Sequence, residues 1–177
     1  YYDQFYNIVK DGENGSCYTV FQIWGPGKTA KIQCDFSAMM SPDNFRDFIQ
    51  ESLRKQAKQL DNVLYHLDGP DAIKHVDALM EIDEIDALQW TSGDYGPDGT
   101  FEEWYPIYDK AVAAGKGLWI KVYSGEFHAW IEWLDKLVAR YGAEKAKKVA
   151  KALGHTIYES VDQETGKITH KVVLNNG

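Results

Sequence analysis

The hydrophobic and polar residues of this chain alternate in two patterns, one typical of strands and one typical of helices. Short apolar runs bounded by turn residues predict strands at 18–24, 30–36, 62–67, 86–90 and 117–123. Apolar residues three or four positions apart predict helices at 71–80, at 101–114 and around 127–138. A first helical segment at 1–9 ends at the turn residues 11–15.

The clearest predicted helix follows Ser41. Ser41 is a favourable N-cap residue, and Pro42 suits the first helical turn. An apolar stripe at helical spacing continues from there, with Phe45, Phe48, Ile49, Leu53 and Leu60. The stripe predicts a helix that packs by one face against the strands.

The alternation of strands and helices predicts an α/β fold with a parallel sheet and right-handed crossovers: a barrel, part of a barrel or a doubly wound sheet. With 177 residues, the chain is shorter than the roughly 250 residues of a typical closed (β/α)8 barrel. Functional loops follow the carboxyl ends of such strands. We therefore expect five residues near one rim of the sheet: Trp24, His66, Asp68, Trp90 and Ser124.

The carboxyl-terminal part differs in character from the rest of the chain. Residues 143–153 are rich in Lys and Ala and predict a helix, and the segments 156–160 and 168–174 flank a glycine turn, which predicts an antiparallel hairpin. We therefore divide the chain into a partial (β/α) barrel domain at 1–142 and an appendage of helix and hairpin at 143–177.

Charge and cysteine content exclude several classes of function. The chain carries 19 Lys and Arg against 27 Asp and Glu, a formal net charge of -8, and such a surface repels the phosphate backbone of nucleic acid. No apolar run approaches the roughly 20 residues of a membrane span. Because the only cysteines are Cys17 and Cys34, we expect a protein of the reducing cytoplasm. The partner that we expect is a small-molecule substrate.

His66 and Asp68 are the strongest candidates for chemistry. Residues two apart in a strand point to the same side, so both side chains can face one pocket where the strand ends. A carboxylate beside an imidazole can raise its basicity for acid–base catalysis, or both groups can bind a metal. The alternative is a hydrogen-bonded core histidine and an aspartate that caps the next helix.

Three ordered motifs resemble proteins of the uroporphyrinogen decarboxylase-like superfamily. The motifs are QCDFSAMMSP at 33–42, YHLDGP at 65–70 and ALQW at 87–90. The likeness extends over about 18–122 and is strongest to the corrinoid methyltransferase branch, which includes trimethylamine corrinoid protein-like sequences. It implies that the chain is the carboxyl-terminal part of a TIM barrel of the uroporphyrinogen decarboxylase type, with an active site at the carboxyl rim.

The resemblance implies two chemistries. Decarboxylases of the superfamily act on a porphyrinogen without a cofactor, whereas its methyltransferases use zinc to activate a thiol that takes a methyl group from a corrinoid on a partner protein. His66 matches the first zinc ligand of the methyltransferases, but Asp68 stands where they have a cysteine, and no cysteine follows Cys34. Asp68 would then bind zinc or another divalent metal together with His66, or contact the substrate directly.

Six further residues at predicted strand ends and in loops are candidates for substrate binding. They are Trp24, Asp35, Gln89, Trp90, Trp104 and Tyr105. Aromatic faces can surround a methylated ammonium through cation–π attraction. The alternative for the aromatic residues is core packing or a lid.

Three hypotheses for the function follow. The first is enzymatic methyl transfer to or from a corrinoid partner, on a small substrate such as a methylated amine. The second is a decarboxylase-like enzyme that uses acid–base chemistry at His66 and Asp68. The third is a noncatalytic half-barrel that binds a small molecule or forms a homo-oligomer through its exposed strand edges.

Overall fold

The computed structural model describes residues 1–93, 96–122, 124–142, 156–161 and 168–173. The chain divides into two compact units, Tyr1–Ser124 and Gly125–Gly177. The boundary expected from the sequence, between 142 and 143, lies within the second unit. All of the candidate site residues belong to the first unit.

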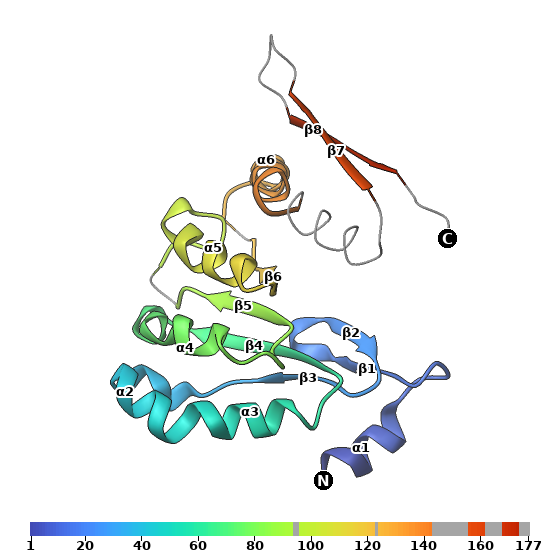
Figure 1. Cartoon of the computed structure of the whole chain (residues 1–177), viewed down its shortest axis with the longest axis vertical. Helices are drawn as coiled ribbons and strands as arrows, with labels where there is room; N and C mark the ends of the chain where they lie inside the picture. Colours follow the sequence, from blue (N-terminus) through green and yellow to red (C-terminus); the bar gives the residue numbers. More distant parts are fainter. Residues whose placement is uncertain (94–95, 123, 143–155, 162–167, 174–177) are drawn as a thin grey trace. The chain divides into compact units, whose positions relative to one another are not determined.

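A four-stranded parallel sheet forms the centre of the first unit (Figure 1). Its strands are β3 (Thr29–Ile32), β4 (Asn62–Asp68), β5 (Ala87–Thr91) and β6 (Gly117–Ile120). They lie in the order β3-β4-β5-β6, so each strand pairs with the next one along the chain, and β4 and β5 are the inner strands. The predicted α/β fold with a parallel sheet is confirmed.

Helical segments connect each pair of neighbouring strands (Figure 1). The connection from β3 to β4 contains η2 (Asp35–Met39), α2 (Pro42–Phe45), η3 (Arg46–Gln50) and α3 (Glu51–Ala57). The other two connections contain η4 (Pro70–His75) with α4 (Val76–Met80), and η5 (Glu102–Trp104) with α5 (Tyr105–Ala113). The helices predicted at 71–80 and 101–114 are therefore present, each with a 3₁₀ segment before its α-helical part.

The connecting segments pack against one face of the sheet. Tyr65 and Trp90 point to that face, and each is 1% exposed. The Tyr65 hydroxyl lies beside Cys34, at the start of η2, and burial raises the pKa of this phenol. The ring of Trp90 contacts the ring of Trp104 in η5, with the centroids 4.9 Å apart. The hydrophobic core of the unit therefore lies between the sheet and its crossovers.

The helical segment after Ser41 begins as the sequence predicts. The Ser41 hydroxyl accepts a hydrogen bond from the backbone N–H of Asn44 at 3.2 Å, and Pro42 occupies the first turn. The cap satisfies one of the backbone N–H groups that have no partner within a helix.

The apolar stripe of this segment differs in part from the prediction. Phe45, Leu53 and Ala57 are buried, but Phe48 is 68% exposed, so its assignment to the inward face is wrong. The reason is the π-helical turn η3, whose wider ring brings side chains four residues apart onto one face. Phe45, Leu53 and Ala57 follow this spacing, and Phe48 does not.

The amino-terminal residues form a helix and a hairpin. Helix α1 (Tyr2–Val9) confirms the helical segment predicted at 1–9. The single strand predicted at 18–24 is wrong, because β1 (Gly15–Tyr18) and β2 (Ile23–Pro26) pair antiparallel with the 3₁₀ turn η1 (Thr19–Phe21) between them. Gln22 has a left-handed φ of 52°, which an extended strand does not allow.

The β1–β2 hairpin lies against the amino-terminal end of β3. Ser16 Oγ accepts a hydrogen bond from the backbone N–H of Thr29 at 2.8 Å, and the Tyr2 hydroxyl donates one to the Thr29 carbonyl at 3.0 Å. Both backbone groups of Thr29 are therefore paired with side chains. Such pairing protects an edge strand from adding a further strand at that point.

The second unit contains a helix and an antiparallel hairpin. The helix α6 (Phe127–Leu137) continues into the π-helical turn η6 (Val138–Gly142), as the apolar pattern around 127–138 predicts. Strands β7 (Thr156–Val161) and β8 (Ile168–Val173) pair antiparallel, which confirms the predicted hairpin. The helix expected at 143–153 lies outside the described residues. Of the helices that the structure describes, none has the length and apolar character needed to cross a bilayer.

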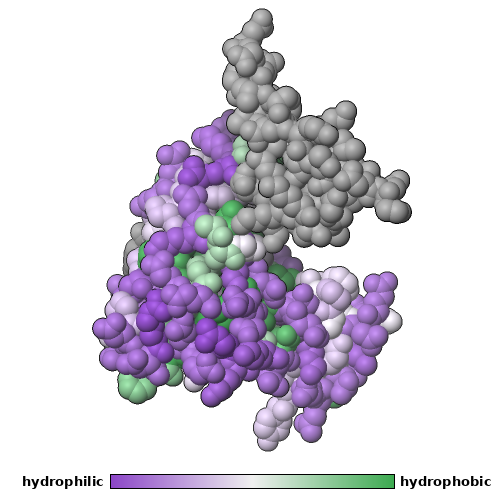
Figure 2. Space-filling model, viewed as in Figure 1, coloured by the Kyte–Doolittle hydropathy of each residue, from purple (hydrophilic) through white to green (hydrophobic). Residues whose placement is uncertain are grey.

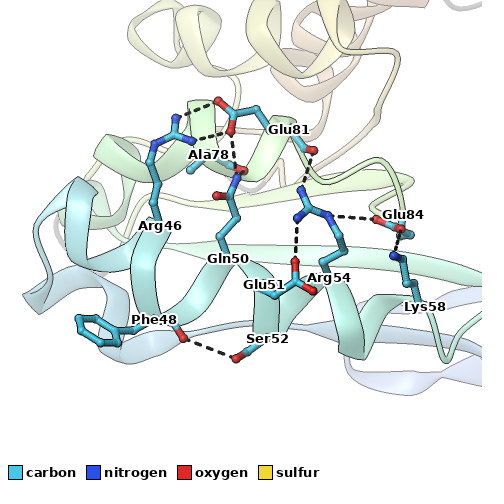
Figure 3. A network of polar contacts seen from close by, with 10 residues as sticks. All are labelled: Arg46, Phe48, Gln50, Glu51, Ser52, Arg54, Lys58, Ala78, Glu81 and Glu84. Carbon is cyan, nitrogen blue, oxygen red and sulfur yellow. Dashed lines mark hydrogen bonds and ion pairs between the residues drawn. The ribbon is translucent and has the colours of Figure 1, made fainter.

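Polar side chains connect η3 and α3 to the end of α4 on the surface of the first unit (Figure 3). Arg46 Nη2 donates to Glu81 Oε1 at 2.9 Å, and Gln50 Nε2 donates to Glu81 Oε2 at 3.0 Å. Arg54 donates to the backbone oxygen of Glu81 at 3.2 Å and to Glu51 Oε2 at 2.9 Å. This network belongs to a mainly hydrophilic surface, as Figure 2 shows for one face of the molecule.

We expect the contribution of this network to depend on pH. Hydrogen bonds from Arg46 and Gln50 lower the pKa of Glu81 from 4.5 to about 2. Because the folded value lies below the unfolded one, the stabilisation is present above pH 4.5 and is lost as the pH falls through about 2. Glu81→Gln should lower the free energy of unfolding by about 1 kcal/mol or less at neutral pH, since the pair is solvent-screened.

Urea unfolding of the wild type and of Glu81→Gln at several pH values measures this contribution. The difference should narrow as the pH is lowered toward 2. Glu51→Gln, which removes an exposed ion-pair partner of Arg54, is the matched control. A difference for Glu81→Gln that is the same at every pH would contradict the assignment.

Candidate functional site

His66 and Asp68 lie side by side at the carboxyl end of β4. Both point to the face of the sheet opposite Tyr65 and Trp90, and His66 Nε2 lies 3.7 Å from Asp68 Oδ2. The His66 side chain is 12% exposed and that of Asp68 is 49% exposed. The expectation that both side chains point to the same side of an inner parallel strand is confirmed. Asp68 is the more exposed of the two residues.

Gln89 of β5 lies opposite His66 in the sheet register. Its Oε1 contacts Nδ1 of His66, while its Nε2 donates to the backbone oxygen of Trp90 at 2.7 Å and to Thr91 Oγ1 at 2.8 Å. Gln89 is 1% exposed. Of the residues predicted to bind substrate, Gln89 is the one that directly contacts His66, and it holds the imidazole from the side away from Asp68.

Two aromatic residues that sequence reasoning missed lie next to this group. The Phe21 ring is 5.0 Å from the His66 ring and 5.7 Å from the Trp119 ring, centroid to centroid, and Trp119 is the register partner of Gln89. Lys31 Nζ lies 5.7 Å from the centre of the Phe21 ring. Trp119 lies in the strand predicted at 117–123, but aligning the starts of 117–123 and 86–90 would place it opposite Leu88. Its position beside Gln89 depends on the register that the structure shows.

Asp35 belongs to a polar chain that follows β3. Lys31 Nζ donates to Gln33 Oε1, and Gln33 Nε2 donates to Asp35 Oδ1. Asp35 is exposed at the start of η2. The chain links Asp35 to Lys31, which lies over Phe21, so Asp35 is connected to the His66 group only through intervening side chains.

The other aromatic candidates are not gathered around His66. Trp90 is 1% exposed and Trp104 is 8% exposed, and they contact each other on the helix-covered face. Tyr105 begins α5, with its ring 6.4 Å from that of Tyr108. Trp90 and Trp104 therefore do not form an aromatic cage on the face that carries His66.

The sequence predicted Trp24 at the carboxyl rim of the sheet, but it does not lie there. It belongs to the β1–β2 hairpin, which contacts the amino-terminal end of β3, and its Nε1 donates to Asp11 Oδ2 at 2.8 Å. The indole lies over Gly15, where an added Cβ would come within 2.4 Å of the ring. At 54% exposure, Trp24 is a fixed surface residue of the hairpin.

The residues around His66 do not provide the ligands of a typical catalytic zinc ion. Gln89 occupies Nδ1, so Nε2 and the Asp68 carboxylate remain, whereas such sites use three protein ligands. Within the part of the chain that the structure describes, no three His, Cys, Asp or Glu side chains are grouped to hold a metal. The metal site expected at His66 and Asp68 stays a prediction.

No protein-family model, curated protein or solved structure matches this chain. The candidate site is therefore defined by its own geometry together with the sequence motifs.

The loop after β5 is fixed to the end of β6 by Asp98. This carboxylate is 1% exposed; its Oδ1 accepts from Thr100 N at 3.0 Å, and its Oδ2 accepts from Ser124 N at 2.7 Å. Trp104 Nε1 donates to the Asp98 backbone oxygen at 3.1 Å. These bonds hold residues 98–104 at the carboxyl end of the sheet, which is the end that carries His66.

We expect Asp98→Asn to destabilise the first unit. An amide cannot accept at both ends, so one buried N–H loses its partner, at a cost of about 1–3 kcal/mol. Urea unfolding measures the loss, and the exposed Asp43→Asn is the matched control, with little change expected. Equal stability of Asp98→Asn and the wild type would show that the Asp98 bonds do not stabilise the fold.

Proposed function

We propose that this chain is part of a (β/α) barrel enzyme of the uroporphyrinogen decarboxylase-like type, and that it acts on a small substrate by acid–base chemistry at His66 and Asp68. The observation that carries the proposal is the pair itself, 3.7 Å apart on one face of the inner strand β4. In proteins with parallel strands joined by helices, active sites lie at this end of the sheet.

The strand order favours a barrel over a doubly wound sheet. A doubly wound sheet reverses its strand order at a switch point and has helices on both faces. Here four successive strands are neighbours without reversal, and side chains from the crossovers contact the face of Tyr65 and Trp90. The opposite face, which carries His66, corresponds to the inner face of a barrel.

The proposed chemistry uses the atoms of the pair that face each other. His66 Nε2 takes a proton from the substrate, and the neighbouring Asp68 carboxylate stabilises the imidazolium. In a decarboxylation, the C–C bond to the carboxylate breaks and carbon dioxide leaves. The electron pair of the broken bond stays on the substrate carbon, and the imidazolium returns the proton to that carbon. Asp68 is half exposed, so a substrate can reach the pair from its side.

A ligand-observed NMR screen of small carboxylic acids against the full chain tests this proposal. Acids that bind at the site should bind at least about tenfold more weakly to His66→Ala, a difference of about 1.4 kcal/mol. Their affinity should also change in Asp68→Asn, which removes a negative charge beside the ligand. Asp43→Asn, on the exposed surface of α2, is the control and should bind like the wild type. Binding that is the same in all four proteins, or no binding to the wild type, would contradict the proposal.

A second candidate function, methyl transfer with a corrinoid protein as partner, is favoured by the aromatic side chains beside His66. Lys31 Nζ over Phe21 places an ammonium group against an aromatic face, next to Trp119. A methylated amine has the same charge and would be attracted to the same ring faces. The resemblance in sequence independently suggests such a substrate.

Titration with trimethylammonium, followed by tryptophan fluorescence, separates the two candidates. Methyl transfer predicts saturable binding that is lost in Trp119→Ala and kept in Trp24→Ala, because Trp24 belongs to the β1–β2 hairpin at the amino-terminal end of β3. It also predicts that added cob(I)alamin takes a methyl group from trimethylammonium, which releases dimethylamine and forms methylcobalamin with a change in absorbance. The absence of both changes would remove this candidate.

A further inference from the structure

We infer that Gln89 is a positioning residue that holds His66 with its proton on Nδ1, and so makes Nε2 the atom that exchanges protons beside Asp68. The sequence suggested Gln89 as a substrate contact, and the structure gives it a different role. The catalytic consequence rests on the proposed acid–base function, but the tautomer can be measured without any activity.

The partners of Gln89 fix the orientation of its amide. Nε2 lies 2.7 Å from the backbone oxygen of Trp90, and a backbone carbonyl can only accept a hydrogen bond. The NH2 group must therefore point to Trp90, a direction that Thr91 Oγ1 at 2.8 Å also favours. The remaining amide atom, Oε1, faces His66. Because Gln89 is 1% exposed, bulk water does not compete for these bonds.

The orientation of Gln89 determines the tautomer of His66. An amide oxygen can only accept, so the Nδ1 atom that contacts it must carry hydrogen. In the neutral imidazole, Nε2 then has the lone pair, and it lies 3.7 Å from Asp68 Oδ2. Nε2 is therefore the atom of the neutral ring that can take up a proton, and the resulting imidazolium would lie beside the Asp68 carboxylate.

His75, the other histidine of the first unit, provides an internal contrast. Its Nε2 lies 2.8 Å from the backbone oxygen of Ser37, so this nitrogen carries the hydrogen. Its buried Nδ1 has no hydrogen-bond partner, and burial lowers the pKa of the ring, which favours the neutral form. The two histidines should therefore have opposite tautomers in the same protein.

Nitrogen-15 NMR of the full chain, labelled at the histidine side chains and recorded where the rings are neutral, tests the inference. His66 should give a pyrrole-type signal at Nδ1 and a pyridine-type signal at Nε2, and His75 should give the reverse. Gln89→Leu removes the acceptor, so His66 should shift toward hydrogen on Nε2, donated to Asp68. Gln89→Glu keeps an acceptor oxygen and should retain hydrogen on Nδ1. Gln50→Leu, which removes a glutamine bonded to Ala78 and Glu81, is the matched control.

A pyrrole-type signal at Nε2 of wild-type His66 would overturn the inference. So would Gln89→Leu with an unchanged His66 tautomer, provided that the His75 signals are native and show the variant to be folded. If Gln89→Leu does not fold, the wild-type and Gln89→Glu spectra still decide the question. Tautomers as inferred, together with ligand binding that does not depend on His66, would leave the role of Gln89 intact and remove the proposed function.

Discussion

The register between β4 and β5 is the constraint on which the candidate site depends. It places His66 opposite Gln89 and Leu67 opposite Trp90, so one face of the sheet carries polar side chains and the other carries the core. A shift of one residue would exchange the two faces of a strand, exposing Trp90 and burying Gln89 without its partner. The packing of Trp90 against Trp104 on one face therefore helps to fix the side of the sheet on which the polar group lies.

Much of the fold could be predicted from the sequence because the signals that determine it are local. The strands β4 and β5 are apolar runs between clear turn residues, and the Ser41 cap is a local signal that the structure confirms. The β1–β2 hairpin could not be predicted in this way. Its reversal depends on the left-handed φ of Gln22, a residue type that does not usually mark such a position. The exposure of Phe48 depends on a π-helical turn, which has no simple sequence pattern.

The candidate site could be predicted only where the alternation of side chains along a strand determines the direction of a residue. The side chains of His66 and Asp68 are two residues apart in one strand, so their common direction follows from the pleat. Phe21 could not be assigned to the site. The sequence predicted a strand at 18–24, whereas Phe21 lies in the 3₁₀ turn η1. Trp90 and Trp104 were candidates because they are aromatic residues near strand ends, but parity places Trp90 on the face opposite Gln89. An aromatic residue near a strand end is therefore informative only together with its register.

The side-chain bonds to Thr29 have a consequence for how the sheet can grow. In a strand, the N–H and C=O of one residue point to the same side, and for Thr29 that side is occupied by Ser16 and Tyr2. A neighbour arriving at β3 would have to displace both of these side chains before it could pair along the full strand. Extension of the sheet is therefore easier from β6, and closure into the proposed barrel would require Ser16 and Tyr2 to release Thr29.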